Sequence, residues 1–286
     1  MTEAGRSERV CLVTGANAGI GRETAAGLAR SGASVIMVCR NALRGQRALE
    51  ELRRETGNQR VRLQLCDLSS QASIRDLARR VLGEHERLHV LINNAAVLPR
   101  RREVTVDGLE RQFATNHLAG FLLTRLLLER LAQSAPARVV NVASSAHAGA
   151  TIDFEDLQAE RDYHPRRVYG RTKLMNVLFT YELARRLAGS GVTANCLHPG
   201  TIATSLLGDY VGLPRPLRRL PSLFFGSPAK GARTSLHLAL AGDLEEKSGL
   251  YFKDCRPVPS SQESKDEQVA ARLWEVSERL AGLDRP

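Results

Sequence analysis

Short runs of apolar and β-branched residues alternate along the chain with longer segments whose apolar residues recur every three or four positions. The short runs predict six strands: Arg9–Thr14, Ser34–Cys39, Arg60–Cys66, Val90–Asn93, Arg138–Val142 and Thr193–Leu197. The longer segments predict helices at 20–31, 42–56, 70–84, 107–134 and 167–190. Near-continuous apolar strands that alternate with helices are typical of a parallel sheet covered on both faces.

The remainder of the chain extends this pattern. A helix near 228–241 leads to Gly249–Phe252, a candidate last strand, and 266–286 is expected to form a C-terminal helix and tail. No repeat, low-complexity tract or Gly/Ser-rich linker divides the 286 residues. We therefore expect a single α/β domain, built as a doubly wound Rossmann-type parallel sheet of about seven strands, with a flexible N-terminus at residues 1–8.

One segment, 201–226, interrupts the alternation. It contains three prolines, several leucines and two adjacent phenylalanines, and it follows the carboxyl end of a predicted strand. Open α/β sheets bind ligands at that edge, and loops of this length are usually functional, so we expect a lid over a substrate. The alternative is a fixed surface loop that packs on the core or on a partner subunit.

The composition narrows the class of protein. Hydrophobic residues make up 43% of the chain and charged residues 25%, as in globular proteins. No apolar run approaches the length of a membrane span, and the polar N-terminus has no secretory signal. The five cysteines are widely spaced and form no CxxC pair. We therefore expect a cytoplasmic protein without a bound metal.

The net charge of +10 is spread along the chain, and aromatic residues make up only 5%. A nucleic-acid binder usually concentrates its basic residues on one element, so the pattern argues against a nucleic-acid partner. An anionic small molecule or an anionic membrane surface is a better use of the charge. The arginines of 201–226 would suit a peripheral membrane contact.

A glycine-rich turn, TGANAGIG at 14–21, connects the first strand to the first helix. Glycine allows the backbone to approach a pyrophosphate, and the N-terminus of a helix offers free N–H groups to it. The alternative is a plain strand-to-helix connection, which the position inside a βαβ unit disfavours. The predicted phosphate-binding residues are Gly15, Asn17, Gly19, Ile20 and Gly21.

Arginine at the end of the second strand selects the form of the dinucleotide. An acid at this place would bind the ribose 2′-hydroxyl of NAD(H), whereas Arg40 suits the 2′-phosphate of NADP(H). Arg22 could supply a second charge, and Asp67 would lie near the adenine. We therefore predict NADP(H) as the cofactor, the alternative being that both arginines are ordinary surface residues.

A catalytic group is indicated by polar residues that all follow strands or share one helix face. Tyr169 and Lys173 are four positions apart, hence on the same face of a predicted helix. Ser144 and Ser145 follow the strand that ends at Val142, and the run NNAA at 93–96 closes another strand. Parallel strands end at one edge of a sheet, so these residues are expected to lie together.

These motifs together resemble those of the short-chain dehydrogenase/reductase family, over nearly the whole chain. The matching residues are TGANAGIG at 14–21, DL at 67–68, NNAA at 93–96, Asn116, Ser145, YGRTK at 169–173 and HPGTIAT at 198–204. Stretches such as LHVLINNAA, NHLAGFLLT and LFTYELARRL are similar to the retinol-dehydrogenase-like branch. The family's usual NNAG motif is NNAA here, with Ala96 in place of glycine.

The resemblance implies a role for each site residue. Tyr169 would exchange a proton with the substrate oxygen, and Lys173 would lower the pKa of Tyr169 and hold the nicotinamide ribose. Ser145 would hydrogen-bond the substrate oxygen, and Asn116 would hold a water linked to Lys173. Further cofactor contacts would come from Leu68, Asn93, Ala95, Pro199, Gly200 and Thr204. We expect packing or backbone bonding from Ser144, and structural or solvent roles from His117, His147 and His198.

The predicted function is that of an NADP(H)-dependent oxidoreductase that interconverts a carbonyl and an alcohol on a lipophilic substrate. Retinal, retinol or other apolar aldehydes and ketones are the leading substrates. One alternative is reduction of a carbon–carbon double bond on the same scaffold, and another is a non-catalytic NADP(H)-binding sensor or scaffold protein. The presence of both Tyr169 and Lys173 favours an enzyme. The resemblance also implies a homo-oligomer.

Overall fold

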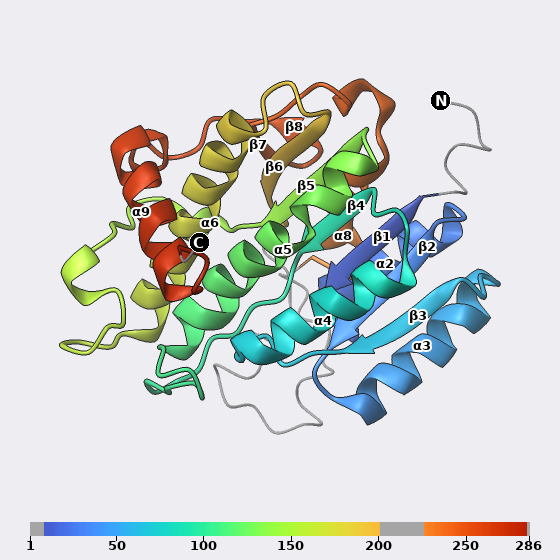
Figure 1. Cartoon of the computed structure of the whole chain (residues 1–286), viewed down its shortest axis with the longest axis horizontal. Coiled ribbons are helices and arrows are strands. Elements are labelled where there is room, and N and C mark those ends of the chain that lie inside the picture. Colours follow the sequence, from blue (N-terminus) through green and yellow to red (C-terminus); the bar gives the residue numbers. More distant parts are fainter. Residues whose placement is uncertain (1–8, 201–225, 285–286) are drawn as a thin grey trace.

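The structure, a computed structural model, describes residues 9–200 and 226–284 and contains one eight-stranded sheet between two layers of helices (Figure 1). The strands are β1 (Val10–Thr14), β2 (Ser34–Cys39), β3 (Val61–Leu65), β4 (Val90–Asn93), β5 (Ala137–Val142), β6 (Val192–His198), β7 (Tyr251–Lys253) and β8 (Arg256–Pro257). The main helices are α2 (Gly19–Arg30), α3 (Ala42–Thr56), α4 (Gln71–Glu84), α5 (Ala119–Gln133), α6 (Pro165–Arg186), α8 (Pro228–Leu240) and α9 (Glu267–Leu280).

The strands lie in the order β3-β2-β1-β4-β5-β6-β7-β8, and every neighbouring pair is parallel except β7 with β8. The predicted doubly wound parallel sheet is therefore confirmed. The two-residue strand β8 adds an antiparallel edge beyond the expected seven strands, because Asp254 and Cys255 turn the chain back with φ of 49° and 61°. The strand order reverses between β1 and β4, which is where folds of this type bind ligands.

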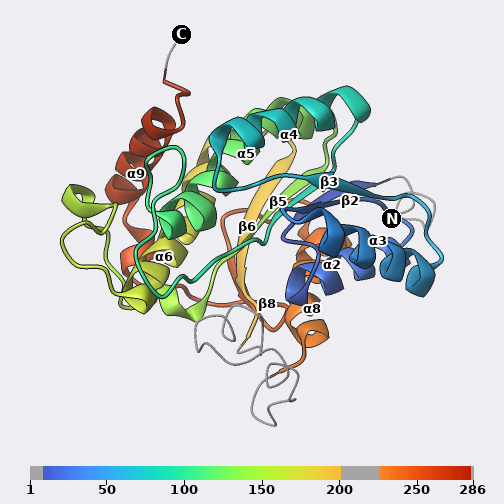
Figure 2. The ribbon, with the colours of Figure 1, turned by 90° about the horizontal axis from the view of Figure 1, so that it is seen from below.

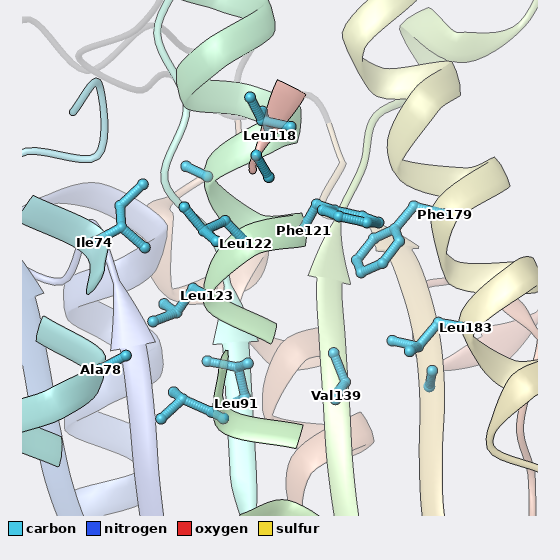
Figure 3. Close-up of a cluster of buried hydrophobic side chains, with 14 of the residues drawn as sticks. Ile74, Ala78, Leu91, Leu118, Phe121, Leu122, Leu123, Val139, Phe179 and Leu183 are labelled. Carbon is cyan, nitrogen blue, oxygen red and sulfur yellow. The ribbon is translucent and has the colours of Figure 1, made fainter. Parts of the chain in front are cut away.

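Side chains that alternate along each strand fill two separate cores. On β1, Leu12 packs beneath α4, α5 and α6, whereas Cys11 and Val13 pack against the layer of α2, α3 and α8. Figure 2 shows α4 and α5 on one face of the sheet and α2, α3 and α8 on the other. The first core is drawn in Figure 3, where Phe121 of α5 and Phe179 of α6 face each other above Val139 of β5.

The C-terminal helix α9 covers the outer side of α5 and α6. Its Trp274 is 4% exposed, and its ring centroid lies 5.1 Å from that of Phe121 and 5.9 Å from that of Phe179. The guanidinium of Arg186 lies 4.2 Å from the Trp274 ring centroid, a distance that suits a cation–π contact. Helix α9 therefore fixes the spacing of the two helices that approach the candidate site.

The segment expected to be helical from residue 107 begins with a different structure. A bridge pairs Val104 with Glu110, and both oxygens of the buried Glu110 carboxylate accept backbone N–H groups, from Gln112 (2.8 Å) and Phe113 (2.7 Å). A π-helical turn, Phe113–Leu118, then leads into α5. Such turns insert one residue into a helix and often occur at functional sites.

Helix α6 also differs from its expected bounds, because it ends at Arg186 instead of 190. Gly189 and Gly191, with φ of 78° and 74°, reverse the chain into β6. Thr204 and the predicted lid, apart from Gly226, lie outside the described residues, so the lid stays a prediction. Within the two described ranges, no helix combines the length and the apolar character that a membrane span requires.

Candidate active site

The candidate site lies at the carboxyl ends of the parallel strands, where the predicted residues gather. Thr14 ends β1, Asn93 ends β4, Val142 ends β5 and His198 ends β6. The structure also brings predicted cofactor residues to this edge, in the turn after β1, in the first turn of α2, or at and just beyond the ends of β3, β4 and β6. They are Gly15, Asn17, Gly19, Ile20, Gly21, Asp67, Leu68, Asn93, Ala95, Pro199 and Gly200.

The turn after β1 has a backbone that only glycine adopts easily. Gly15 and Gly19 have φ of 67° and 56°, in the left-handed region. At Gly21, an added Cβ would overlap the carbonyl oxygen of Gly15 and the side-chain amide of Asn94. The N-cap residue of α2 is Ala18, which cannot cap the helix with its side chain. The turn is therefore a close-packed cradle whose helix N–H groups are available to an anion.

Thr14 ties this turn to the end of β4. Its hydroxyl accepts hydrogen bonds from the backbone N–H groups of Asn94 (2.9 Å) and Ala95 (3.1 Å). The Asn94 amide returns a bond to the Thr14 carbonyl at 2.7 Å. The side chain of Asn93 points elsewhere, because its Nδ2 donates to Thr124 (3.0 Å) and to Asn141 (2.9 Å). The NNAA run thus holds the glycine-rich turn in place and joins β4 to its neighbours.

The two arginines predicted to bind a phosphate, Arg40 and Arg22, have different surroundings. Arg22 is paired with Glu23 at 2.7 Å and with Glu55, and its side chain is 18% exposed. Arg40 has a side chain that is 60% exposed, and it lies 4.0 Å from the Asp67 carboxylate. The Arg40 guanidinium is therefore exposed at the edge of the sheet, whereas the Arg22 guanidinium is ion-paired with Glu23 and Glu55.

Asp67, which follows β3, has surroundings that favour its ionised form. Its Oδ1 accepts hydrogen bonds from the Ser69 backbone N–H (3.0 Å) and the Ser69 hydroxyl (2.7 Å). Burial alone would raise the pKa of Asp67, but these hydrogen bonds and the charge of Arg40 outweigh it and lower the pKa below its usual value. The carboxylate is therefore ionised at neutral pH and draws Arg40 toward the third strand.

Helix α6 carries Tyr169 and Lys173 on one face, as predicted. Lys173 is 1% exposed, and its Nζ donates a hydrogen bond of 2.9 Å to the carbonyl of Val142 at the end of β5. Burial lowers the pKa of Lys173 to about 8, because the charged amine has lost its water. The same Nζ lies 5.4 Å from the centroid of the Tyr169 ring. A cation therefore sits beside the phenol.

Ser144, not Ser145, contacts the phenol. Burial raises the pKa of Tyr169 to about 12, and a hydrogen bond with the Ser144 side chain acts in the opposite direction. Ser144 is still extended, with φ of −164° and ψ of 157°, whereas Ser145 begins a short 3₁₀ turn and its side chain is exposed. Recognising that the extended chain continues past Val142 would have favoured Ser144. The substrate role expected of Ser145 stays a prediction, and Ser144 is a second candidate for it because it interacts with the phenol.

Asn116 lies in the π-helical turn, and its side chain is engaged by two other elements. Its Oδ1 accepts from Val97 N–H at 2.7 Å, and its Nδ2 donates to the Val97 carbonyl (3.0 Å) and to Thr172 (3.2 Å). Thr172 is the neighbour of Lys173 on α6. Asn116 thus joins the chain after β4 to α6, and its water-holding role stays a prediction.

The neighbouring histidine, His117, belongs to the core. It is 1% exposed, and its Nε2 lies 3.0 Å from the Ser277 hydroxyl of α9. Burial lowers the pKa of His117 to about 4, so the ring is neutral at physiological pH.

Among the residues that the structure describes, no group of His, Cys, Asp or Glu side chains could hold a metal ion. The Tyr169 phenol, the Ser144 hydroxyl and the Lys173 ammonium together can hold an oxygen atom and move a proton to or from it.

Comparison with known proteins places this arrangement among oxidoreductases. A family model described as short chain dehydrogenase matches residues 9–211. Retinol dehydrogenase 12 of Mus musculus is 50% identical over 275 residues, which cover 96% of this chain and 87% of that protein. Retinol dehydrogenase 11 of Homo sapiens is 47% identical over 275 residues, which cover 96% of this chain and 86% of that protein.

Solved structures share the fold over nearly the whole chain. The crystal structure of an uncharacterised protein from Mycobacterium paratuberculosis has a TM-score of 0.80 and 36% identity, and the match covers 100% of this chain and 99% of that one. A short chain dehydrogenase from Shigella flexneri, complexed with NADP, has a TM-score of 0.68 and 25% identity. That match covers 87% of this chain and 97% of that one.

Proposed function

Because the chain belongs to the short-chain dehydrogenase family, whose members are oxidoreductases that use NAD(H) or NADP(H), we propose that it interconverts a carbonyl and an alcohol on a lipophilic, retinal-like substrate with NADP(H). The observation that carries the proposal is the buried Lys173 beside a phenol that is also bonded to Ser144. A sensor or scaffold protein would have no need for this arrangement. A buried ammonium costs free energy, and here its position serves proton transfer.

The substrate class is supported by the relatives. Proteins named retinol dehydrogenase match 96% of the chain at 47–50% identity. The family model covers residues 9–211, which include Ser144, Tyr169 and Lys173. Retinal is a long apolar aldehyde, so it needs only one polar anchor, at its oxygen. The Ser144 and Tyr169 hydroxyls supply that anchor and would orient the carbonyl carbon toward the turn that holds the cofactor.

The residues at the strand ends fit a dinucleotide. The glycine cradle leaves no room for a Cβ at Gly21, and the N-terminus of α2 is free to face a pyrophosphate. Arg40 would hold the 2′-phosphate of NADP(H), because its guanidinium is the exposed one. When bound, the dinucleotide would exchange a hydride with the carbonyl carbon, which is chemistry that no side chain supplies.

Tyr169, assisted by Ser144 and Lys173, would transfer the proton to and from the substrate oxygen. In the direction of reduction, the Tyr169 hydroxyl donates its proton to the substrate oxygen, while Ser144 donates a hydrogen bond to the same atom. The phenolate left on Tyr169 is then stabilised by the ammonium of Lys173, because opposite charges attract strongly where water is excluded. In the direction of oxidation the phenolate takes the proton back from the alcohol.

Replacing Tyr169 by phenylalanine tests the proposed chemistry. We expect the wild-type protein to oxidise NADPH in the presence of all-trans-retinal, and Y169F to lose turnover while it still binds NADPH, because only the phenol oxygen is removed. Tyr181→Phe on the same helix is the control, since its hydroxyl bonds to Ser260 away from the site, and it should keep its activity. Turnover by Y169F at the wild-type rate would remove the phenol from the mechanism.

Separate replacement of the two serines tests which of them holds the substrate. Ser144→Ala should lower kcat by about a hundredfold, the usual effect of removing one donor to a reacting oxygen. Ser145→Ala should stay close to wild type, because Ser145 is exposed and the phenol interacts with the Ser144 side chain. Steady-state kinetics with retinal would decide between them, and the reverse order of effects would restore Ser145 to the role.

Reversing the charge at Arg40 tests the cofactor choice. Arg40→Asp should raise the Kd for NADPH at least tenfold and leave that for NADH nearly unchanged, because a charge-assisted contact of about 1.5–3 kcal/mol becomes a repulsion. Arg54→Asp makes the same change in net charge at the far end of α3 and serves as the control. Equal NADPH affinities of R40D and wild type, measured by fluorescence titration, would place the 2′-phosphate elsewhere.

A further inference from the structure

Two histidines hold a single peptide group beside the candidate catalytic serine. The Nδ1 of His147 lies 2.6 Å from the carbonyl oxygen of Ser144. The Nδ1 of His198 accepts a hydrogen bond of 3.2 Å from the backbone N–H of Ser145. This carbonyl and this N–H belong to the same peptide unit, the one that joins the two serines. His147 therefore binds the carbonyl end of this peptide dipole, and His198 binds its N–H end.

The surroundings determine where each ring carries its hydrogen. The Nε2 of His147 accepts a bond of 3.1 Å from the Ser261 N–H, so its hydrogen is on Nδ1 and is donated to Ser144. His198 must have a lone pair on Nδ1 to accept from Ser145. The two rings are thus neutral and in opposite tautomers. Protonation of His198 would replace its acceptor nitrogen by a second donor, facing the Ser145 N–H.

Both rings are rigidly placed. His147 and His198 are 3% and 8% exposed, and the His147 ring centroid lies 4.9 Å from that of Tyr251 on β7. His198 ends β6, next to Leu197, whose carbonyl accepts a 2.8 Å bond from the Ala143 N–H. The two histidines therefore connect the peptide after Ser144 to β6 and β7, so the positions of these strands determine where the peptide lies.

That peptide group determines where the Ser144 hydroxyl lies. Its plane fixes ψ of Ser144 at 157°, which keeps the residue extended as it leaves β5. The Ser144 hydroxyl, in turn, accepts a 3.2 Å bond from the Ala146 N–H and contacts Tyr169. A rotated peptide would move the following turn and the hydroxyl with it.

We propose that His147 and His198 are positioning residues for the oxidoreductase reaction, which hold the Ser144–Ser145 peptide so that the Ser144 hydroxyl meets Tyr169 and the substrate oxygen, and that protonation of His198 releases this peptide. The inference rests on the role proposed above for Ser144. Neither histidine touches the substrate oxygen, so each acts through the backbone.

The pH at which His198 would fail follows from its neighbours. Burial lowers the pKa of His198 below its usual value and the charge of Lys253 lowers it further, while Asp254 raises it. The acceptor form of His198 is therefore complete at neutral pH and is lost as the pH falls through this lowered pKa. We expect an acid limb in the kcat profile that begins below the ordinary pKa of histidine, about 6.5.

Two substitutions at His198 separate positioning from packing. Asparagine presents an oxygen near the place of Nδ1 and does not titrate, whereas leucine fills space without an acceptor. Relative to wild type, His198→Leu should lower kcat about tenfold, as expected for one lost buried hydrogen bond. His198→Asn should recover most of that loss and shift the acid limb to lower pH. His237→Asn, on α8, is the control and should reproduce the wild-type profile.

A double variant distinguishes this inference from the role of Ser144 itself. In the Ser144→Ala background, adding His198→Leu should cause no further loss in kcat, because the hydroxyl that His198 positions is already absent. If S144A alone keeps full activity, the proposed role of Ser144 fails. If S144A is impaired but H198L costs the same tenfold in both backgrounds, or if H198N leaves the acid limb unchanged, only the role of His198 is overturned.

Discussion

The hydrogen bond between the Lys173 ammonium and the Val142 carbonyl is the interaction on which the site depends. A charged amine that is 1% exposed loses most of its hydration, and this loss lowers its pKa to about 8. The bond of 2.9 Å to the last carbonyl of β5 fixes the ammonium at the strand end, next to the Tyr169 ring. Placing the ammonium there requires α6 to pass close to β5 at a defined height.

The rest of the fold meets that requirement. Phe121, Phe179 and Trp274 pack α5, α6 and α9 into one layer, and the sheet beneath supplies Val139 of β5. The side chain of Asn116 bonds to Thr172, which adjoins Lys173, so the π-helical turn is also tied to α6. Where the strand order reverses between β1 and β4, Thr14 joins the glycine-rich turn to the chain just after Asn93, the last residue of β4. Hydride donor and proton donor would thus be held by the same sheet edge.

Much of this arrangement could be predicted from local sequence patterns. Apolar strands that alternate with helices predicted the parallel sheet, and the four-residue spacing of Tyr169 and Lys173 predicted their shared face, because both depend on short-range periodicity. The surroundings of Arg22 could not be predicted, since its partner Glu55 lies 33 positions away on another helix. The choice between Ser144 and Ser145 depended on where the extended chain ends. The start of the 107–134 segment was not predicted either, because there the Glu110 carboxylate accepts the backbone N–H groups of Gln112 and Phe113.

The most direct test of the account is to follow the transferred hydrogen. NADPH that carries deuterium at the transferable position of its nicotinamide ring would be incubated with the protein and all-trans-retinal, and the product examined by mass spectrometry and NMR. We expect retinol with one deuterium on the former carbonyl carbon, because Tyr169 and Ser144 would hold the carbonyl oxygen. Deuterium on a carbon of a former double bond, or a product without deuterium, would contradict it.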